Sequence, residues 1–259
     1  MRPTLFHIGE FAVPSFWVMA FLAFVVGFFL VRSEIRRRGM PEELAYDILL
    51  YAYIGGWVGA RLFLIPTAWE LFRADPIAFL LSGSGWVWYG GVIGGALAVF
   101  LLARRNRMPL LVLADIVAPA LAMGLGIGRI GCQLSGDGDY GVPTDLPWGM
   151  SYPHGVVPTT ERVHPAPVYE MLASFAIFAF LWRRRANARL GEVIGWYLVL
   201  APAARFGIEF VRRNPAWLWG LTTAQAYSVA LMGLGFWLLW SSHRVARDPN
   251  GASAAGNEN

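Results

Sequence analysis

Residues 124–131 read GLGIGRIG and end an apolar run that begins at Leu110. The run is long enough to cross a bilayer, because about 20 apolar residues span the hydrocarbon core as a helix. Arg129 therefore lies where a predicted membrane helix meets the loop that follows it, and arginine keeps its charge when it is buried. Such a charge usually marks a polar pathway or a site, although an interfacial arginine can also reach lipid headgroups. The four glycines of the stretch favour a site, since they let backbone and ligand approach closely.

Two further arginines interrupt apolar stretches. Arg205 lies in APAARFGIEF, residues 201–210, where Glu209 follows four positions later on the same helix face. The two side chains form either a simple ion pair or an anion site in which the carboxylate orients the guanidinium. Arg61 lies in IGGWVGARLFLIP, residues 54–66, behind a GGxxG helix-packing pattern. For Arg61, bonding to carbonyls of a neighbouring helix is as good an interpretation as substrate contact.

The composition predicts an integral membrane protein of one domain. Of the 259 residues, 56% are hydrophobic and only 15% are charged, against about 25% in soluble domains. The single cysteine, Cys132, excludes an intrachain disulfide framework and a metal site of several cysteines. The N-terminus lacks the pattern of a cleavable signal peptide, so we expect the first apolar segment to insert and remain. We predict no metal ion and no cofactor.

Seven apolar segments predict seven transmembrane helices and hence an all-α membrane fold. Their ends are uncertain by several residues. The expected spans are Val13–Val31, Ile48–Pro66, Trp86–Ala103, Leu110–Ile127, Pro167–Trp182, Val193–Phe210 and Thr222–Trp240.

The arginines between these spans predict the orientation. Thirteen follow the odd-numbered spans and five lie on the opposite side, so the positive-inside rule places the N-terminus in the periplasm and the C-terminus in the cytoplasm. We therefore predict a single seven-span domain over residues 1–240. Within it, residues 131–165 form an irregular, outward-facing periplasmic cap loop between spans four and five. Residues 241–259 are a polar cytoplasmic tail that we expect to be disordered.

Several other polar side chains are candidates for the site. Asp115 and Glu170 are carboxylates inside predicted spans, for which a structural counter-ion role is the default. Asp137 and Asp139 bracket a glycine in SGDGDYG, and we prefer a turn there to a metal site, because the further oxygen ligands of a calcium loop are missing.

Two histidines of the predicted cap could accept a proton near neutral pH, although loop histidines are more often only solvated. They are His154 and His164. Tyr89, at the start of YGGVIGG, is either an aromatic residue of the membrane interface or part of the site.

Taken together, these segments resemble the prolipoprotein diacylglyceryl transferases of bacterial inner membranes. The resemblance runs from about Pro14 to Trp240 and rests on the combination of motifs rather than on any one of them. The motifs are GARL at Gly59–Leu62, YGGVIGG at Tyr89–Gly95, DIVAP at Asp115–Pro119, GLGIGRIGCQLSGD at Gly124–Asp137, PWGM at Pro147–Met150, HPAPVYE at His164–Glu170 and RFGIEFVRRNP at Arg205–Pro215.

The resemblance implies an enzyme that transfers a diacylglyceryl group from phosphatidylglycerol to the lipobox cysteine of a prolipoprotein and releases glycerol phosphate. Such a site must hold a phosphodiester, stabilise the charge on the departing phosphate and deprotonate a thiol with a pKa near 8.5. By resemblance, Arg129 and Arg205 would perform the first two tasks, and Glu209 would support Arg205.

The chain departs from the family pattern where the thiol base is expected. Tyr89 stands in place of the family's histidine, and Cys132, Gln133 and Ser135 replace an Asn-Phe-x-Asn run. Phe16–Trp17 occupies the place of a tyrosine-bearing motif. Tyrosine, with a pKa near 10, is a poor base at neutral pH. The base is then another group, for which the candidates are Asp137, Asp139, His154, His164 or an oxygen of the substrate phosphate.

By motif and position we assign catalytic roles to Arg129, Arg205, Glu209, Tyr89, Asp137 and His164. As substrate-binding residues we assign Arg61, Gly90, Gly91, Gly128, Gly131, Tyr169, Glu170 and Arg212. Arg212 and its neighbour Arg213 also suit interfacial anchors. The expected partners are phosphatidylglycerol, the prolipoprotein signal peptide and membrane lipid, with no nucleic acid, and we expect a monomer. The alternatives are a divergent paralogue with another acceptor and a membrane protein that transports or binds lipid without catalysis.

Overall fold

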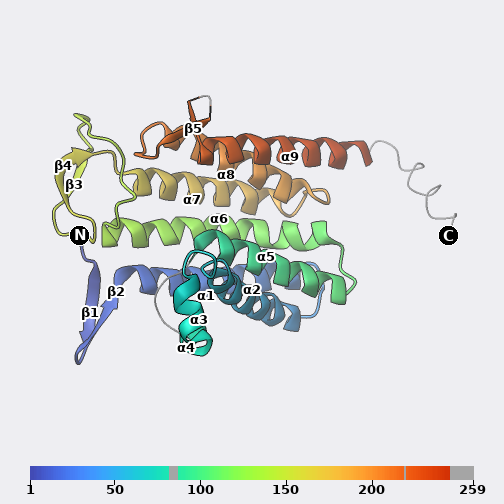
Figure 1. Ribbon diagram of the computed structural model, residues 1–259. Coiled ribbons are helices and arrows are strands. Elements are labelled where there is room, and N and C mark those ends of the chain that lie inside the picture. Colours follow the sequence, from blue (N-terminus) through green and yellow to red (C-terminus); the bar gives the residue numbers. More distant parts are fainter. Residues whose placement is uncertain (82–86, 219, 246–259) are drawn as a thin grey trace. The chain divides into compact units, whose positions relative to one another are not determined.

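The computed structural model describes residues 1–81, 87–218 and 220–245, and the fold is helical (Figure 1). Trp86, where we placed the start of the third span, and residues 246–259 of the predicted tail lie outside the described residues. Among the helices described, seven have 18 residues or more, and each coincides with one predicted span. They are α1 (Ser15–Arg37), α2 (Glu43–Leu62), α5 (Trp88–Arg105), α6 (Leu110–Ser135), α7 (Ala166–Arg184), α8 (Glu192–Glu209) and α9 (Thr223–Val245).

Two of these helices, α1 and α6, are long and apolar enough by themselves to cross a membrane. The others carry more polar residues. In α8, for example, Glu192, Arg205 and Glu209 fall within 18 residues. The short helices α3 (Trp69–Ala74) and α4 (Pro76–Leu81) follow α2.

Short antiparallel strand pairs adjoin the ends of the long helices. They are β1 (Thr4–Ile8) with β2 (Phe11–Pro14), β3 (Met150–Tyr152) with β4 (Thr159–Val163), and β5 (Ala216–Leu218) with β6 (Leu221–Thr222). The pair β3–β4 lies within the predicted cap loop, and α6 continues to Ser135, beyond the predicted end of its span. The segment expected to be irregular is therefore partly ordered by a helix end and a hairpin.

The chain divides into two compact units, Val31–Leu113 and the remainder, Met1–Leu30 with Ala114–Asn259. The second of these, which we call the larger unit, contains α7, α8 and α9 packed side by side (Figure 1). Its apolar core joins Ala118 and Ala122 of α6 to Ile177 and Leu181 of α7 and to Val193 of α8. This core sits at the end of α7 opposite the cap segment, because Leu181 is near the end of that helix.

Asp115 ties α6 to the start of α8. Its two carboxylate oxygens accept hydrogen bonds from the backbone N–H groups of Gly191, at 2.7 Å, and of Ile194, at 2.9 Å. A carboxylate is stabilised at this end of a helix, where backbone N–H groups lack helical partners. Asp115 is thus a structural carboxylate that fixes α8, which carries Arg205 and Glu209 near its far end.

In the smaller unit, α2 and α5 pack through glycines. A side chain at Gly59 would place its Cβ 2.3 Å from the carbonyl oxygen of Gly90 and 2.8 Å from Cα of Gly94. Only glycine allows backbones this close. The GGxxG and YGGVIGG patterns therefore serve helix packing here.

Candidate functional site

Arg129 lies near the end of α6, just before the segment that joins α6 to α7. Its side chain is 20% exposed, and its guanidinium forms ion pairs with Asp139, from the loop that follows α6, and with Glu170 of α7. It also approaches the sulfur of Cys132, at 3.7 Å. The arginine predicted to be the centre of the site is therefore already surrounded by anionic and polarisable groups.

Glu170 joins the helices at this end. Its side chain is 5% exposed; one oxygen pairs with Arg129, and the other accepts hydrogen bonds from Arg205, at 2.9 Å, and Arg212, at 3.3 Å. A buried carboxylate needs such partners, because its desolvation is expensive otherwise. The counter-ion role predicted for Glu170 is present, and it connects α6, α7 and α8.

Glu209 pairs with Arg205 at 2.6 Å, as the spacing of four residues predicts. The carboxylate is fully buried, and its other oxygen accepts hydrogen bonds from Asn214 Nδ2, at 2.7 Å, and from the hydroxyl of Thr222, at 2.8 Å. Neither Asn214 nor Thr222 was predicted. These two bonds fix Glu209, and Glu209 in turn directs the guanidinium of Arg205.

Asp139 bridges two arginines, with one oxygen on Arg129 and the other 2.6 Å from Arg212. Burial raises the pKa of this carboxyl, but the positive charges of Arg212 and Arg129 outweigh burial and bring the pKa below its ordinary value. Arg212 is 9% exposed. It is thus a member of the charged group rather than the interfacial anchor that its place at the end of a helix suggested.

We call these six residues the arginine cluster: Arg129, Arg205, Arg212, Asp139, Glu170 and Glu209. Arginines and carboxylates alternate in it, and three of each give a formal charge of zero. Because α6 ends, α7 begins and α8 ends here, the cluster collects residues from distant parts of the sequence. Guanidinium groups that are already positioned are suited to binding an anion.

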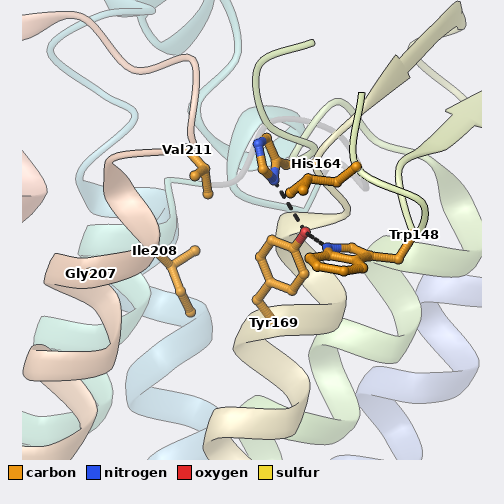
Figure 2. Close-up of a pocket in the computed structure, with 7 residues that line it drawn as sticks. Trp148, His164, Tyr169, Gly207, Ile208 and Val211 are labelled. Atoms are coloured by element: carbon orange, nitrogen blue, oxygen red, sulfur yellow. Dashed lines mark hydrogen bonds between the residues drawn. The ribbon is translucent and has the colours of Figure 1, made fainter. Parts of the chain in front are cut away.

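A pocket of about 420 Å³ is lined in part by residues that directly precede members of the cluster in the sequence (Figure 2). Its lining is mostly apolar and includes Ile208, next to Glu209, and Val211, next to Arg212. Tyr169, next to Glu170, lies at the centre of a short polar chain in this pocket.

In that chain the Tyr169 hydroxyl accepts a hydrogen bond from Trp148 Nε1, at 2.8 Å, and lies 3.2 Å from His164 Nδ1 (Figure 2). Trp148 is exposed and Tyr169 is half-buried. The hydroxyl therefore fixes the orientation of the His164 ring, and the second ring nitrogen, Nε2, is left for other contacts.

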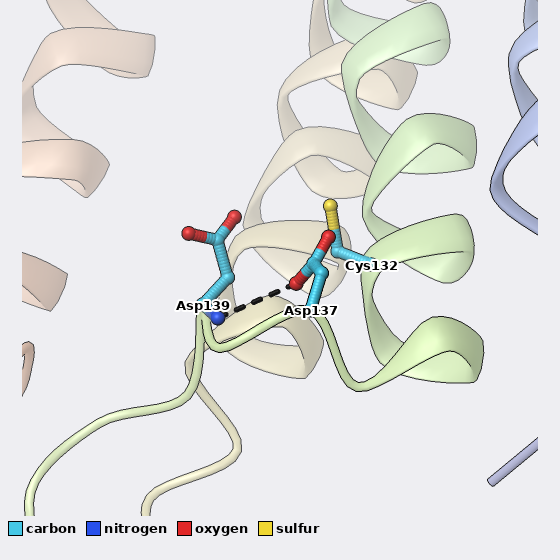
Figure 3. Close-up of side chains that lie close together, drawn as sticks. All are labelled: Cys132, Asp137 and Asp139. Atoms are coloured by element: carbon cyan, nitrogen blue, oxygen red, sulfur yellow. Dashed lines mark hydrogen bonds between the residues drawn. The ribbon is translucent and has the colours of Figure 1, made fainter. Parts of the chain in front are cut away.

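Asp137 takes part in the turn that leads to Asp139. Its oxygen accepts a hydrogen bond from the backbone N–H of Asp139, at 3.3 Å, which is the turn that we preferred for SGDGDYG. Figure 3 shows Cys132, in the last turn of α6, beside Asp137 and Asp139 of the loop that follows. The atoms of these three side chains that could bind a metal lie within 4.8 Å of one another. Both oxygens of Asp139 are engaged by arginines, so the group is better described as a turn that presents Asp139.

His154, the other histidine considered as a base in the sequence, is exposed.

Gly128 and Gly131, both predicted to bind substrate, have different surroundings. A side chain at Gly131 would meet Phe16 and Met19 of α1 at 3.2–3.3 Å, so this glycine serves helix packing. Around Gly128 no atom lies within 4 Å of the position of a Cβ, among the residues described.

The remaining predicted residues belong to the smaller unit. Arg61 is 1% exposed at the end of α2, and Gly90 packs its backbone against Gly59. Gly91 faces Gly56 across the same helix pair. Tyr89 is the second residue of α5, but its side chain lies outside the described residues. Roles in substrate binding for these residues stay predictions.

Comparison with known proteins identifies the family of this chain. A family model described as prolipoprotein diacylglyceryl transferase matches residues 3–241. The chain is 31% identical to phosphatidylglycerol–prolipoprotein diacylglyceryl transferase 2 of Clostridium perfringens, over 95% of this chain and 96% of that protein. It is 34% identical to the phosphatidylglycerol–prolipoprotein diacylglyceryl transferase of Chromohalobacter salexigens, over 95% and 94%. Because the match extends along nearly the whole chain, this protein belongs to the prolipoprotein diacylglyceryl transferase family.

Proposed function

We propose that this protein transfers the diacylglyceryl group of phosphatidylglycerol to the lipobox cysteine thiol of a prolipoprotein and releases glycerol phosphate. The family supplies the reaction, and the relatives are named for this donor and acceptor. The observation that carries the proposal is the convergence of Arg129 and Arg205 on one carboxylate, Glu170, because it brings two guanidiniums together near the predicted outer membrane surface.

The donor presents a single negative charge on its phosphodiester, which two guanidiniums can bind through parallel hydrogen bonds. Arg129 and Arg205 are 20% and 29% exposed, the two most accessible arginines of the cluster. Glu209 is fully buried and held on its other oxygen by Asn214 and Thr222, so it orients Arg205 without competing at the surface.

In the reaction, the thiolate sulfur forms a bond to the glycerol carbon of the diacylglyceryl group, and the bond from that carbon to the phosphate oxygen breaks. The electron pair of the broken bond stays on the departing glycerol phosphate, which gains a second negative charge. Preorganised guanidiniums stabilise this developing charge more than the charge of the donor, and this difference lowers the barrier.

His164 is our choice for the group that takes the thiol proton. A carboxylate with a pKa near 4 is a much weaker base toward a thiol of pKa near 8.5 than an imidazole is. Asp139 is further disfavoured because two arginines engage it. His164, in contrast, lines the pocket, and its Nδ1 lies 3.2 Å from the Tyr169 hydroxyl. With the ring hydrogen on Nδ1, this nitrogen donates to the hydroxyl and Nε2 can accept the thiol proton.

The topology belongs to the same proposal. All seven long helices would cross the inner membrane, with the N-terminus and residues 131–165 on the periplasmic side and the C-terminus in the cytoplasm. The excess of arginines after the odd-numbered helices supports this orientation. It places the cluster and the pocket at the outer surface, where a secreted prolipoprotein presents its lipobox. The enzyme would act as a monomer and without a cofactor.

The test uses purified protein in vesicles of phosphatidylglycerol with a lipobox peptide. We expect release of glycerol phosphate together with a gain of one diacylglyceryl group in the peptide mass, and neither with a peptide whose cysteine is replaced by serine. Release of glycerol phosphate without modification of the peptide would indicate another acceptor. Neither product from a folded, lipid-bound protein would contradict catalysis and leave the lipid-binding alternative.

A further inference from the structure

Asp139 differs from the other two carboxylates of the arginine cluster. Glu170 and Glu209 lie on helices and are 5% and 0% exposed, whereas the side chain of Asp139 lies on a loop and is 32% exposed. Glu209 is also held by Asn214 and Thr222. Asp139 is therefore the carboxylate of the cluster that can leave its partners for water at the lowest cost.

The contacts of Asp139 are those that a phosphate would make. One carboxylate oxygen meets Arg129, and the other lies 2.6 Å from Arg212. A phosphodiester has two free oxygens and can bridge a pair of arginines in the same way, with each oxygen bound to a different guanidinium. An incoming phosphate must therefore compete with Asp139 for Arg129.

We propose that Asp139 is an internal surrogate for the donor phosphate, which occupies Arg129 and Arg212 in the empty site and is displaced when the phosphodiester binds. The proposal rests on the proposed function for the identity of the anion. It assigns Arg212, which the sequence predicted to bind substrate, a direct contact with the phosphate, and it gives Asp139 a role other than that of base.

The charge of the cluster favours an exchange over simple addition. The empty cluster is neutral, and a bound phosphodiester with Asp139 still in place would leave a net charge of −1 among partly buried groups, which is costly. If Asp139 moves into water, the cluster with the phosphodiester is again neutral. The product, glycerol phosphate, carries a charge approaching −2. The returning carboxylate of Asp139 then restores neutrality and helps to expel the product.

The loop permits this movement and confines it. Gly136 and Gly138 have positive φ angles, +60° and +92°, so the backbone before Asp139 turns at residues without side chains. Directly after it the chain is fixed: Tyr140 stacks on Tyr152 with ring centroids 4.9 Å apart, and the N–H of Gly141 donates to the carbonyl oxygen of His164 at 2.8 Å. Gly136 is also held, because its N–H donates to the carbonyl oxygen of Cys132 and its carbonyl oxygen accepts from the N–H of Val157, both at 2.9 Å. The displacement therefore involves residues 137–139.

The first test compares Asp139→Asn with Asp145→Asn, which removes the same charge from an exposed position of the same segment. The probes are phosphatidylglycerol in mixed micelles, glycerol phosphate and inorganic phosphate, and the readout is the dissociation constant of each. If Asp139 occupies the arginines about 90% of the time, its removal tightens binding of phosphatidylglycerol about tenfold. Asp145→Asn should leave the constant unchanged.

The other outcomes are equally informative. Weaker or unchanged binding of phosphatidylglycerol to Asp139→Asn would overturn the proposal, because a carboxylate that only positions the arginines would have that effect. Tighter binding of the two free phosphates alone would also overturn it, since the competing anion would then not be the lipid. Turnover of the lipobox peptide by the unmodified protein, measured in the same preparation, separates these results from a failure of the proposed function.

A second measurement needs no substitution. Hydrogen exchange of the backbone amides of residues 137–139 in the unmodified protein should accelerate when phosphatidylglycerol is added, because release of Asp139 frees the turn. Slower exchange of these amides on binding would contradict the displacement even if the variant gave the expected constants.

Discussion

Arg129 of α6 and Arg205 of α8 contact opposite oxygens of one carboxylate, that of Glu170 on α7. Two guanidinium groups this close repel each other, and the repulsion is large where little water is present. The shared carboxylate offsets it and sets the separation of the two groups. The distance between the proposed phosphate ligands therefore depends on a residue of a third helix.

We predict that Glu170→Gln destabilises the protein by about 3 kcal/mol or more, the scale for loss of one partner of a buried pair. The amide keeps the volume but removes the charge that balances Arg129, Arg205 and Arg212. Thermal unfolding in detergent should show a lower Tm, and the kcat of any protein that remains folded should fall.

Glu161→Gln is the matched control for this prediction. Glu161 is 65% exposed and its ion pair with Arg213 is 3.6 Å long, and exposed pairs contribute about 0–1 kcal/mol. Its Tm should stay within the error of the measurement. Equal losses for the two variants would argue that Glu170 is not the centre of the cluster.

Arg129→Lys should lower kcat/KM for phosphatidylglycerol by about 100-fold, the usual effect of losing one preorganised donor to a developing oxyanion. Lysine keeps the charge but cannot bind Glu170 and a phosphate from one planar group. Arg213→Lys is the control, because Arg213 lies over the ring of Tyr140 and donates to the carbonyl oxygen of Gly141. Release of glycerol phosphate measures both, and an Arg129→Lys variant with nearly full activity would remove Arg129 from the mechanism.

The sequence predicted the long helices of this fold better than it predicted which residues meet at the helix ends. Each predicted span coincides with a long helix, because unbroken apolar runs leave few alternatives. The pair of Arg205 and Glu209 was also predictable, since a spacing of four residues places both on one helix face. That all seven helices cross the membrane is still a prediction.

The membership of the arginine cluster was harder to predict, because it depends on a turn and on the meeting of three helix ends. Asp137 and Asp139 are equivalent in the sequence, yet the turn after α6 brings only Asp139 to the arginines. Arg212 resembled an interfacial anchor because only its place at a helix end was visible. Asn214 could have been chosen as a candidate because it lies in the RFGIEFVRRNP motif. Thr222 is 13 residues from Glu209 in the sequence, and no motif links the two residues.

Tyr169→Phe tests the orientation of His164. Loss of the hydroxyl leaves Trp148 Nε1 and His164 Nδ1 without their shared partner, so the ring becomes free to rotate. We expect kcat to fall about tenfold or more, a fraction of what a positioned base contributes, with little change in the KM for phosphatidylglycerol. Tyr140→Phe, which removes a hydroxyl bonded to the carbonyl oxygen of Val157, should leave kcat within about twofold. A rise in KM without a change in kcat would assign Tyr169 to lipid binding.

Gly59→Ala should disrupt the smaller unit. The new methyl group would lie 2.3 Å from the carbonyl oxygen of Gly90, and since this atom is backbone, α2 and α5 must move apart. Overpacking of this kind costs about 1–3 kcal/mol. Gly27→Ala in α1, where no described atom lies within 4 Å of the new Cβ, should leave Tm unchanged or raise it. The Tm values of the two variants in detergent give the comparison, and a Gly59→Ala variant as stable as Gly27→Ala would contradict the close packing of α2 on α5.

The low pKa of Asp139 makes its contribution to stability dependent on pH. Its charge is favoured in the folded protein by Arg212 and Arg129, which outweigh burial, so the folded pKa lies below the value of 3.8 expected for an unperturbed aspartate. The stabilisation is therefore complete above about pH 5 and is lost as the pH falls through the folded pKa. The Tm of the unmodified protein should exceed that of Asp139→Asn by a constant amount between about pH 5 and 8, and the difference should shrink in more acid solution. The comparison cancels most of the titration of the other carboxylates, which both proteins share. A difference that grew toward acid pH would mean that burial, rather than the two arginines, dominates at Asp139.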